Sequence, residues 1–299
     1  MNMNREPCTP KKIPTLSLLS EEDLYFKSIK AVINESRKLL RRSKIVYVSI
    51  FNESYKDIIL NWLCNTAQFK GTHSRTLLVS LNDGVCERIR SSWSDVSCVT
   101  LHAGQCSHTD IPCPDLAFAT LRTKLFLELS KASIRFISIE PDTTWLRDPL
   151  VLFSNEYSSK MHQLTFTMNK VFPLSPMKLK SCSIISFQPS KPLVIFLREL
   201  ARALATQKYQ SEQLAFNHLC MTRYGNVKCG TFEFEDFPNR HWYDLTELDR
   251  GMMAASVISN DFSQSLSAKV SMLKSVGHWF INTDGSCRHS AVSDLIRRQ

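Results

Sequence analysis

Apolar runs of strand length alternate with amphipathic segments through the first half of the chain. The apolar runs are nearly continuous, as in strands buried on both faces of a parallel sheet, and they lie at 44–51, 75–81, 96–101 and 134–139. Segments with helical spacing of apolar residues accompany them at 21–42, 57–68, 83–93 and 116–130. This alternation predicts an α/β fold with a mostly parallel central sheet flanked by helices.

The second half of the chain carries a similar pattern. Two more strands are predicted at 163–169 and 181–187, and two more helices at 191–206 and 211–223. A length of 299 residues is enough for one large α/β domain or for two small ones. We expect a flexible leader over 1–20, one domain over 21–290 and a C-terminal tail over 291–299.

The first helix has clear end signals. Ser20 stands at the N-cap, and Asp23 occupies the position at which a capping box usually has Glu or Gln. The basic residues 37–42 fit the solvated face and the C-terminal charge of this helix better than a nucleic-acid site.

Composition and charge narrow the class of protein. Apolar residues make up 43% of the chain, which favours a packed core over disorder, and the net charge of +9 suggests affinity for anions. The basic residues are dispersed and no stacking-aromatic motif accompanies them, so nucleic-acid binding is the weakest hypothesis. No stretch approaches the ~20 apolar residues of a membrane span, and residues 1–14 do not resemble a signal peptide.

Ten cysteines occur, without a Cys-x-x-Cys pair, which disfavours a zinc ribbon or a thioredoxin-type site. Cys64 and Cys182 lie in apolar runs and are expected to be small core residues. Four others lie in loop-like context and could form disulfides in an oxidising compartment: Cys106, Cys113, Cys229 and Cys287.

The strand predicted at 134–139 ends on two carboxylates, Glu140 and Asp142, with Pro141 between them. Proline cannot donate to a sheet, so the strand should end there. Two acids leaving a strand end can converge on one hard cation, which could in turn hold a diphosphate. The alternative is a polar strand cap followed by a turn, and the two acids alone favour that alternative.

The longer segment from Glu140 to Pro149, Glu-Pro-Asp-Thr-Thr-Trp-Leu-Arg-Asp-Pro, resembles the metal-binding motif of the nucleotide-diphospho-sugar transferase family. The resemblance implies a single Rossmann-like domain of the glycosyltransferase A-type fold. It implies Glu140 and Asp142 as ligands of Mn²⁺ or Mg²⁺, and Trp145 as part of the motif. His278, which precedes a Trp late in the chain, is similar to a His that completes the metal shell in related enzymes, although a structural role is its alternative.

Other segments extend the resemblance to nucleotide contacts. Residues 52–65 look like the family's N-terminal motif, which points to Asn52 and Tyr55, while Trp62 and Leu63 fit core packing better. Lys124 matches a basic residue that can face the diphosphate, with a solvated helix Lys as the alternative. Gln213 fits the Asp-Gln-x-x-Phe-Asn segment at 211–217, where Ser211 replaces the first acid. Residues 183–187 lack the glycine that is usual at the sugar site.

The resemblance implies a metal-dependent glycosyltransferase that moves a sugar from a nucleotide-diphosphate donor to a hydroxyl of a glycan, glycoprotein or polysaccharide. A non-catalytic sugar or nucleotide binder of the same fold is the main alternative. The general base is open among five acids: Glu212, Glu233, Glu235, Asp236 and Asp244. The family implies the Golgi lumen, whereas the absence of a visible anchor also fits a soluble protein or a fragment.

Overall fold

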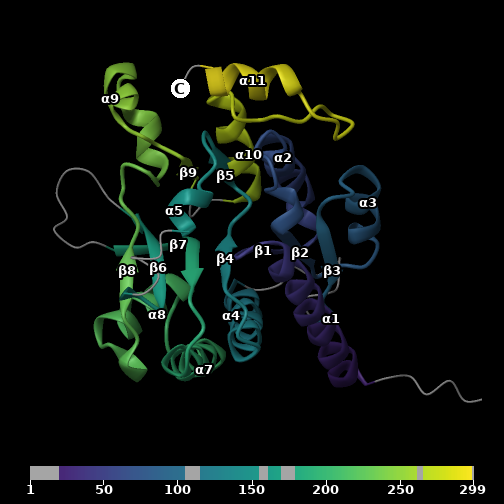
Figure 1. Cartoon of the computed structure of the whole chain (residues 1–299), viewed down its shortest axis with the longest axis vertical. Coiled ribbons are helices and arrows are strands. Elements are labelled where there is room, and N and C mark those ends of the chain that lie inside the picture. The colour runs from purple at the N-terminus through teal and green to yellow at the C-terminus, as the bar shows by residue number, and fades with distance from the viewer. Residues whose placement is uncertain (1–19, 105–114, 155–160, 170–178, 261–264, 298–299) are drawn as a thin grey trace, which may run out of the picture.

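The structure is a computed structural model, and it describes residues 20–104, 115–154, 161–169, 179–260 and 265–297. Its centre is a seven-stranded sheet with the order β3-β2-β1-β4-β7-β6-β8 (Figure 1). The strands are β1 Val46–Phe51, β2 Thr76–Ser80, β3 Ser97–Thr100, β4 Phe136–Ile139, β6 Leu164–Asn169, β7 Leu179–Phe187 and β8 Cys229–Thr231. The α/β fold with a central sheet flanked by helices is therefore confirmed.

The first four strands of the sheet, β3, β2, β1 and β4, run parallel to one another. β7 is antiparallel to both β4 and β6, and β6 is parallel to the edge strand β8. The sheet is thus parallel where the β-α alternation of the sequence is regular and mixed beyond β4.

Helices cover both faces of the sheet. The described helices are α1 Glu21–Arg42, α2 Lys56–Thr66, α3 Val85–Ser92, α4 Asp115–Lys131, α5 Leu150–Ser154, α7 Lys191–Ala205, α8 Glu212–Met221, α9 Glu247–Met252, α10 Leu266–Ser275 and α11 His289–Arg297. α4 and α7 lie at the bottom of the view in Figure 1, and α9 and α11 lie at the top.

Side chains of β1 alternate between two cores, as expected for a strand covered on both faces. Val46, Val48 and Ile50 pack in the cluster that includes α1, α4, α7 and α8. Tyr47 and Phe51 pack in the cluster that includes α2 and α3. The predicted N-cap of α1 is also confirmed, because Ser20 and Asp23 form a reciprocal capping box.

A second, two-stranded sheet fixes the segment that follows Asp142. It pairs β5, Thr143–Trp145, with β9, Val257–Ser259, in antiparallel register. The side chain of Asn65 on α2 both donates to the Trp145 carbonyl and accepts from its N–H, at 3.0 and 2.6 Å. Trp145 is fully buried against Tyr47 and Trp62, so it packs beneath the strand end.

Three disulfides join described cysteines: Cys64–Cys287, Cys86–Cys98 and Cys220–Cys229. Cys64 is buried as expected, but it is not a simple core thiol, because it joins α2 to the C-terminal segment. Cys106 and Cys113 lie outside the described residues.

The C-terminal segment packs through α11. Val292 of α11 is buried in a cluster with Cys64, Phe280 and Ile281. The division into leader, domain and tail, with a boundary at 290/291 inside α11, stays a prediction. No helix of the described ranges combines the length and apolar character that a membrane span requires.

Candidate functional site

The candidate site lies where β1 and β4 end. These strands are parallel neighbours, so Asn52 after β1 and Glu140 after β4 leave the sheet at the same edge, where ligands bind in open α/β sheets. A cavity of about 150 Å³ opens there. Its polar lining comes from the turn after β1, from α4, from the end of β4 and from α10: Asn52, Tyr55, Asp115, Arg122, Glu140, Asp142 and Lys269.

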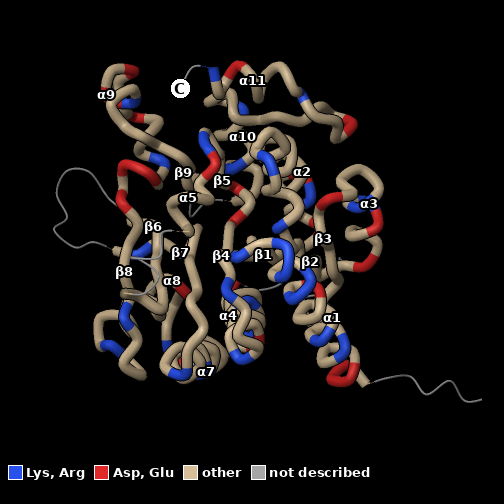
Figure 2. The backbone as a smooth tube through the Cα atoms, in the orientation of Figure 1, with Lys and Arg blue, Asp and Glu red and all other residues tan. Residues whose placement is uncertain are grey.

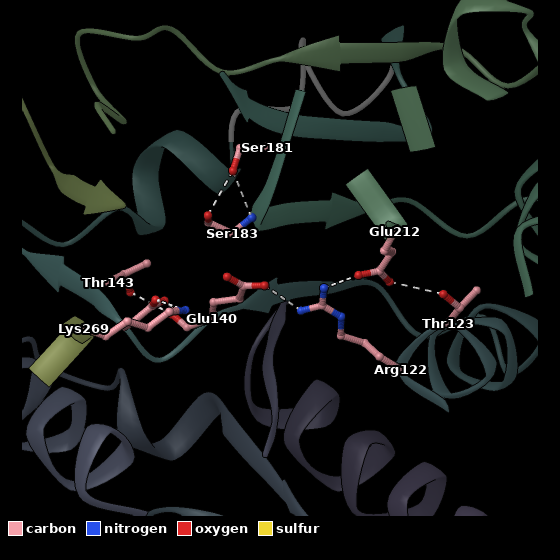
Figure 3. A network of polar contacts seen from close by, with 9 residues as sticks. Arg122, Thr123, Glu140, Thr143, Ser181, Ser183, Glu212 and Lys269 are labelled. Carbon is pink, nitrogen blue, oxygen red and sulfur yellow. Dashed lines mark hydrogen bonds and ion pairs between the residues drawn. The ribbon is translucent and has the colours of Figure 1, made fainter. Parts of the chain in front are cut away.

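Glu140 is held by a buried arginine on α4. Its backbone N–H donates to the Ser183 carbonyl of β7 at 2.8 Å, and its Oε1 accepts from Arg122 Nη1 at 2.8 Å. The Arg122 guanidinium also contacts Glu212 of α8, whose other oxygen accepts from Thr123 (Figure 3). Burial alone would lower the pKa of Arg122, but the carboxylates of Glu212 and Glu140 outweigh it and raise that pKa above its usual value.

Asp142 is held by a lysine from the far end of the chain. Its side chain is only 2% exposed, and Oδ2 accepts from Lys269 Nζ at 2.8 Å. The same ammonium lies 5.7 Å from the centre of the Tyr55 ring, within the range of a cation–π contact. Burial opposes the charge of Lys269, yet Asp142 and Glu140 overcome it, so the pKa of Lys269 is raised.

Tyr243 and Asn260 link His278 to Asp142. Tyr243 donates its hydroxyl proton to Asn260 Oδ1 at 2.7 Å and therefore accepts from His278 Nδ1 at 2.9 Å. Asn260 in turn donates to the Asp142 carbonyl at 2.6 Å. Burial, and then Arg250, lower the pKa of His278 to about 4, so the ring is neutral at physiological pH. His278 borders a different hollow, beside Trp242 and Arg250.

The sequence predictions divide into two groups. Asn52, Tyr55, Glu140 and Asp142 all line the cavity, and their assignments stay predictions of role. Three other predicted residues, Lys124, Gln213 and His278, do not line it. Lys124 is exposed and borders a hollow of about 610 Å³ beside α1 and α7. Gln213 is half-buried on α8, and its carbonyl accepts a hydrogen bond from the Asn217 side chain.

Two cationic residues of the cavity were missed from the sequence. Arg122 is two positions from Lys124 and therefore lies on a different side of α4. The sequence did contain a signal for Arg122, because this charged residue lies in a helix among apolar positions that are buried: Leu121, Leu125 and Leu129. Lys269 gives no such signal, since it lies far beyond the motif in a helix that the pattern did not predict.

The charges of the site fit a divalent cation. Arg122 and Lys269 contact three carboxylates, Glu140, Asp142 and Glu212, and Asp115 also lines the cavity, so negative charge is in excess. The second oxygen of Glu140 accepts no hydrogen bond from any described residue, so it can take a ligand. Mg²⁺ commonly binds through one or two carboxylates together with substrate phosphates.

The expected third ligand is not in place. Within the described ranges no group of three His, Cys, Asp or Glu side chains is arranged to hold a metal, so Glu140, Asp142 and His278 do not form one.

Comparison with known proteins identifies the family. The family model described as nucleotide-diphospho-sugar transferase matches residues 71–273, which is more than half of the chain. The chain therefore belongs to the nucleotide-diphospho-sugar transferase family, and its class is that of the glycosyltransferases. The family predicted from residues 140–149 is confirmed. No curated protein matches the chain.

Solved structures of similar proteins share little sequence with this chain. The apo form of the glycosyltransferase GlyE of Streptococcus pneumoniae TIGR4 is 10% identical over 85% of this chain, with a TM-score of 0.49, and this chain spans 63% of its length. The galactosyltransferase LgtC, in complex with donor and acceptor sugar analogs, is 9% identical over 84% of this chain and 95% of its own, with a TM-score of 0.49. Mouse xyloside xylosyltransferase 1 is 12% identical over 74% of this chain and 99% of its own, with a TM-score of 0.43.

Proposed function

We propose that this protein transfers a sugar from a nucleotide-diphosphate donor to an acceptor hydroxyl of a glycan, glycoprotein or polysaccharide. The observation that carries the proposal is the cavity where β1 and β4 end, which joins Asn52 and Tyr55 to Glu140, Asp142 and Lys269. Family membership supplies the reaction class. In this arrangement the nucleotide lies against the turn after β1, and the diphosphate lies against the acids and Lys269.

The reaction breaks the bond between the anomeric carbon and the diphosphate, so negative charge grows on the leaving group. Lys269 lines the cavity and can donate to a phosphate oxygen there. Arg122 keeps Glu140 in place through its bridge to Glu212. Glu140 and Asp142 would hold a Mn²⁺ or Mg²⁺ ion, and such an ion would supply Lewis-acid stabilisation of the leaving phosphate.

A general base must also accept the proton of the acceptor hydroxyl. None of the five acids considered as general base lines the cavity: Glu212, Glu233, Glu235, Asp236 and Asp244. Glu212 is in addition bound to Arg122 and Thr123, which stabilises its charged form and weakens it as a base. The proposal therefore assigns no general base to these residues.

Disulfides support an oxidising compartment for this activity. Three of them link described cysteines, and such bonds persist in the lumen of the secretory pathway and outside the cell. A Golgi lumen fits this chemistry. Nucleic-acid binding gains no support, because Lys and Arg are spread over many elements with acids among them (Figure 2).

The test is hydrolysis of nucleotide sugars without an acceptor. A panel of uridine- and guanosine-diphosphate sugars is incubated with the wild type, Asp142→Asn and Asp294→Asn, in Mn²⁺ and in chelator. Asp142→Asn should lower Mn²⁺-dependent hydrolysis by at least ~10²-fold, the scale of one preorganised electrostatic contact. Asp294→Asn is the control, because Asp294 lies outside both the motif and the cavity and forms an exposed ion pair with Arg297.

Two outcomes would contradict the proposal. Equal hydrolysis by the wild type and Asp142→Asn would show that the site is wrongly assigned. Binding of nucleotide without hydrolysis of any donor would favour the non-catalytic binder.

A further inference from the structure

The ammonium of Lys269 binds the carboxylate oxygen of Asp142 that a divalent cation would need as a ligand. Its ammonium lies 2.8 Å from Asp142 Oδ2, in a carboxylate that is 2% exposed. The Lys269 side chain is itself mostly buried, and it lines the same cavity as Glu140. A cation that approaches Asp142 from this cavity therefore meets an ammonium already in place.

Two cations cannot share this oxygen without cost. An ammonium and a divalent ion in contact with one carboxylate repel each other strongly where water is largely excluded. Metal binding at Asp142 consequently requires that Lys269 move away. The lysine chain has four flexible methylene groups and three N–H donors, so it can move if another acceptor becomes available.

A bound diphosphate provides that acceptor. Lys269 enters the cavity from α10, and the proposed donor site places the diphosphate in this cavity beside Glu140 and Asp142. A divalent ion at Asp142 leaves the displaced ammonium of Lys269 without its carboxylate partner. The phosphate oxygens of a diphosphate in the same cavity can accept its hydrogen bonds instead.

We propose that Lys269 is a tethered competitor for the divalent cation, holding Asp142 in the metal-free protein and passing to the diphosphate when ion and nucleotide bind. This inference rests on the proposed function. Its consequence is that the ion alone binds weakly, and that ion and nucleotide diphosphate strengthen each other's binding. The site therefore favours the complete donor complex over the ion by itself.

The test is Mn²⁺ binding, measured from the electron paramagnetic resonance signal of free Mn²⁺ in the absence of nucleotide sugar. Lys269→Met removes the competing charge and keeps an unbranched side chain. Lys274→Met is the matched control on the same helix, because Lys274 packs over Trp279 and does not line the cavity. Lys269→Met should bind Mn²⁺ at least ~10-fold more tightly than the wild type, and Lys274→Met should not differ from it. Uridine diphosphate should tighten Mn²⁺ binding in the wild type more than in Lys269→Met.

Equal or weaker Mn²⁺ binding by Lys269→Met would overturn the inference, as would absence of Mn²⁺ binding from both proteins. Lys269→Gln serves as a second variant if the buried Asp142 destabilises the first, because an amide still donates a hydrogen bond. These titrations involve no turnover, so failure of the proposed transferase reaction would be seen separately, in the hydrolysis assay.

The wild type alone gives an independent measurement through lysine labelling read by mass spectrometry. Mn²⁺ alone should increase the labelling of Lys269, and further addition of uridine diphosphate should decrease it again. Lys274 should be labelled equally in all three states. Unchanged or decreased labelling of Lys269 on addition of Mn²⁺ would contradict the displacement.

Discussion

Glu140 and Asp142 are one residue apart, yet the protein holds them in different ways. Glu140 is tied to Arg122, which also binds Glu212, so one guanidinium bridges the strand end and two helices. Asp142 is paired with Lys269, a single flexible side chain from α10 that also faces the cavity. Arg122 and Lys269 both line the cavity, and Glu140 is the more exposed of the two acids, at 27% against 2%. The bridge to Glu212 fixes Arg122 in place, so we expect the Glu140 pair to be structural and the Asp142 pair to be the one that a ligand replaces.

The largest expected effect is a loss of stability when Arg122, the partner of Glu140, is replaced. Arg122→Met leaves Glu140 and Glu212 without their shared cation, and loss of one partner from a buried pair costs about 3–5 kcal/mol. Urea denaturation should show this loss in the free energy of unfolding. Arg202→Met is the control, because its pair with Glu199 is on the surface and should contribute less than ~1 kcal/mol. A loss for Arg122→Met as small as that of the control would break the comparison.

A smaller effect should distinguish the Asp142 pair from the Glu140 pair: stabilisation of the variants by Mn²⁺. We expect Mn²⁺ to replace Lys269 at Asp142 but not to replace the bridge that Arg122 makes to Glu212. Saturating Mn²⁺ should therefore stabilise Lys269→Met by about 2.7 kcal/mol at 100 times its dissociation constant. It should not restore Arg122→Met to the stability of the wild type. Thermal unfolding with and without Mn²⁺ provides the measurement, and similar rescue of both variants would remove the distinction.

The smallest effect concerns Lys124, which the family resemblance points to as a diphosphate contact. Lys124 is exposed and does not line the cavity. Lys124→Met should change the free energy of unfolding by less than ~0.5 kcal/mol, as is usual for surface substitutions. Binding of uridine diphosphate, measured by calorimetry, should also be unchanged. A clear loss of binding would restore Lys124 to the site.

The local pattern of apolar residues and capping residues predicted the strands and helices of the first half of the chain. Strands β1 to β4 and helices α1 to α4 were expected within a few residues, because continuous apolar runs and capping residues such as Ser20 are visible along the chain. β5, β9 and α10 were not expected. β5 is three residues long and exists because Asn65 and β9 pair with it, which no local period reveals.

Contacts between residues far apart in sequence also limited the prediction of the site. The acids after β4 were found because their motif is contiguous, whereas Lys269 meets Asp142 across 127 positions of sequence. His278 was expected beside the acids, yet its hydrogen bonds lead to Asp142 through Tyr243 and Asn260. Motifs located the strand end, and only the three-dimensional contacts identified the cations that hold its two carboxylates.

The most direct measurement is calorimetric binding of uridine or guanosine diphosphate to the wild type and to Asp142→Asn, each in Mn²⁺ and in chelator. The proposed site predicts tight binding only for the wild type in Mn²⁺, because the excess negative charge around Glu140 and Asp142 repels a diphosphate until a divalent ion is present. Binding of equal strength by the wild type in chelator, or by Asp142→Asn in Mn²⁺, would contradict the account.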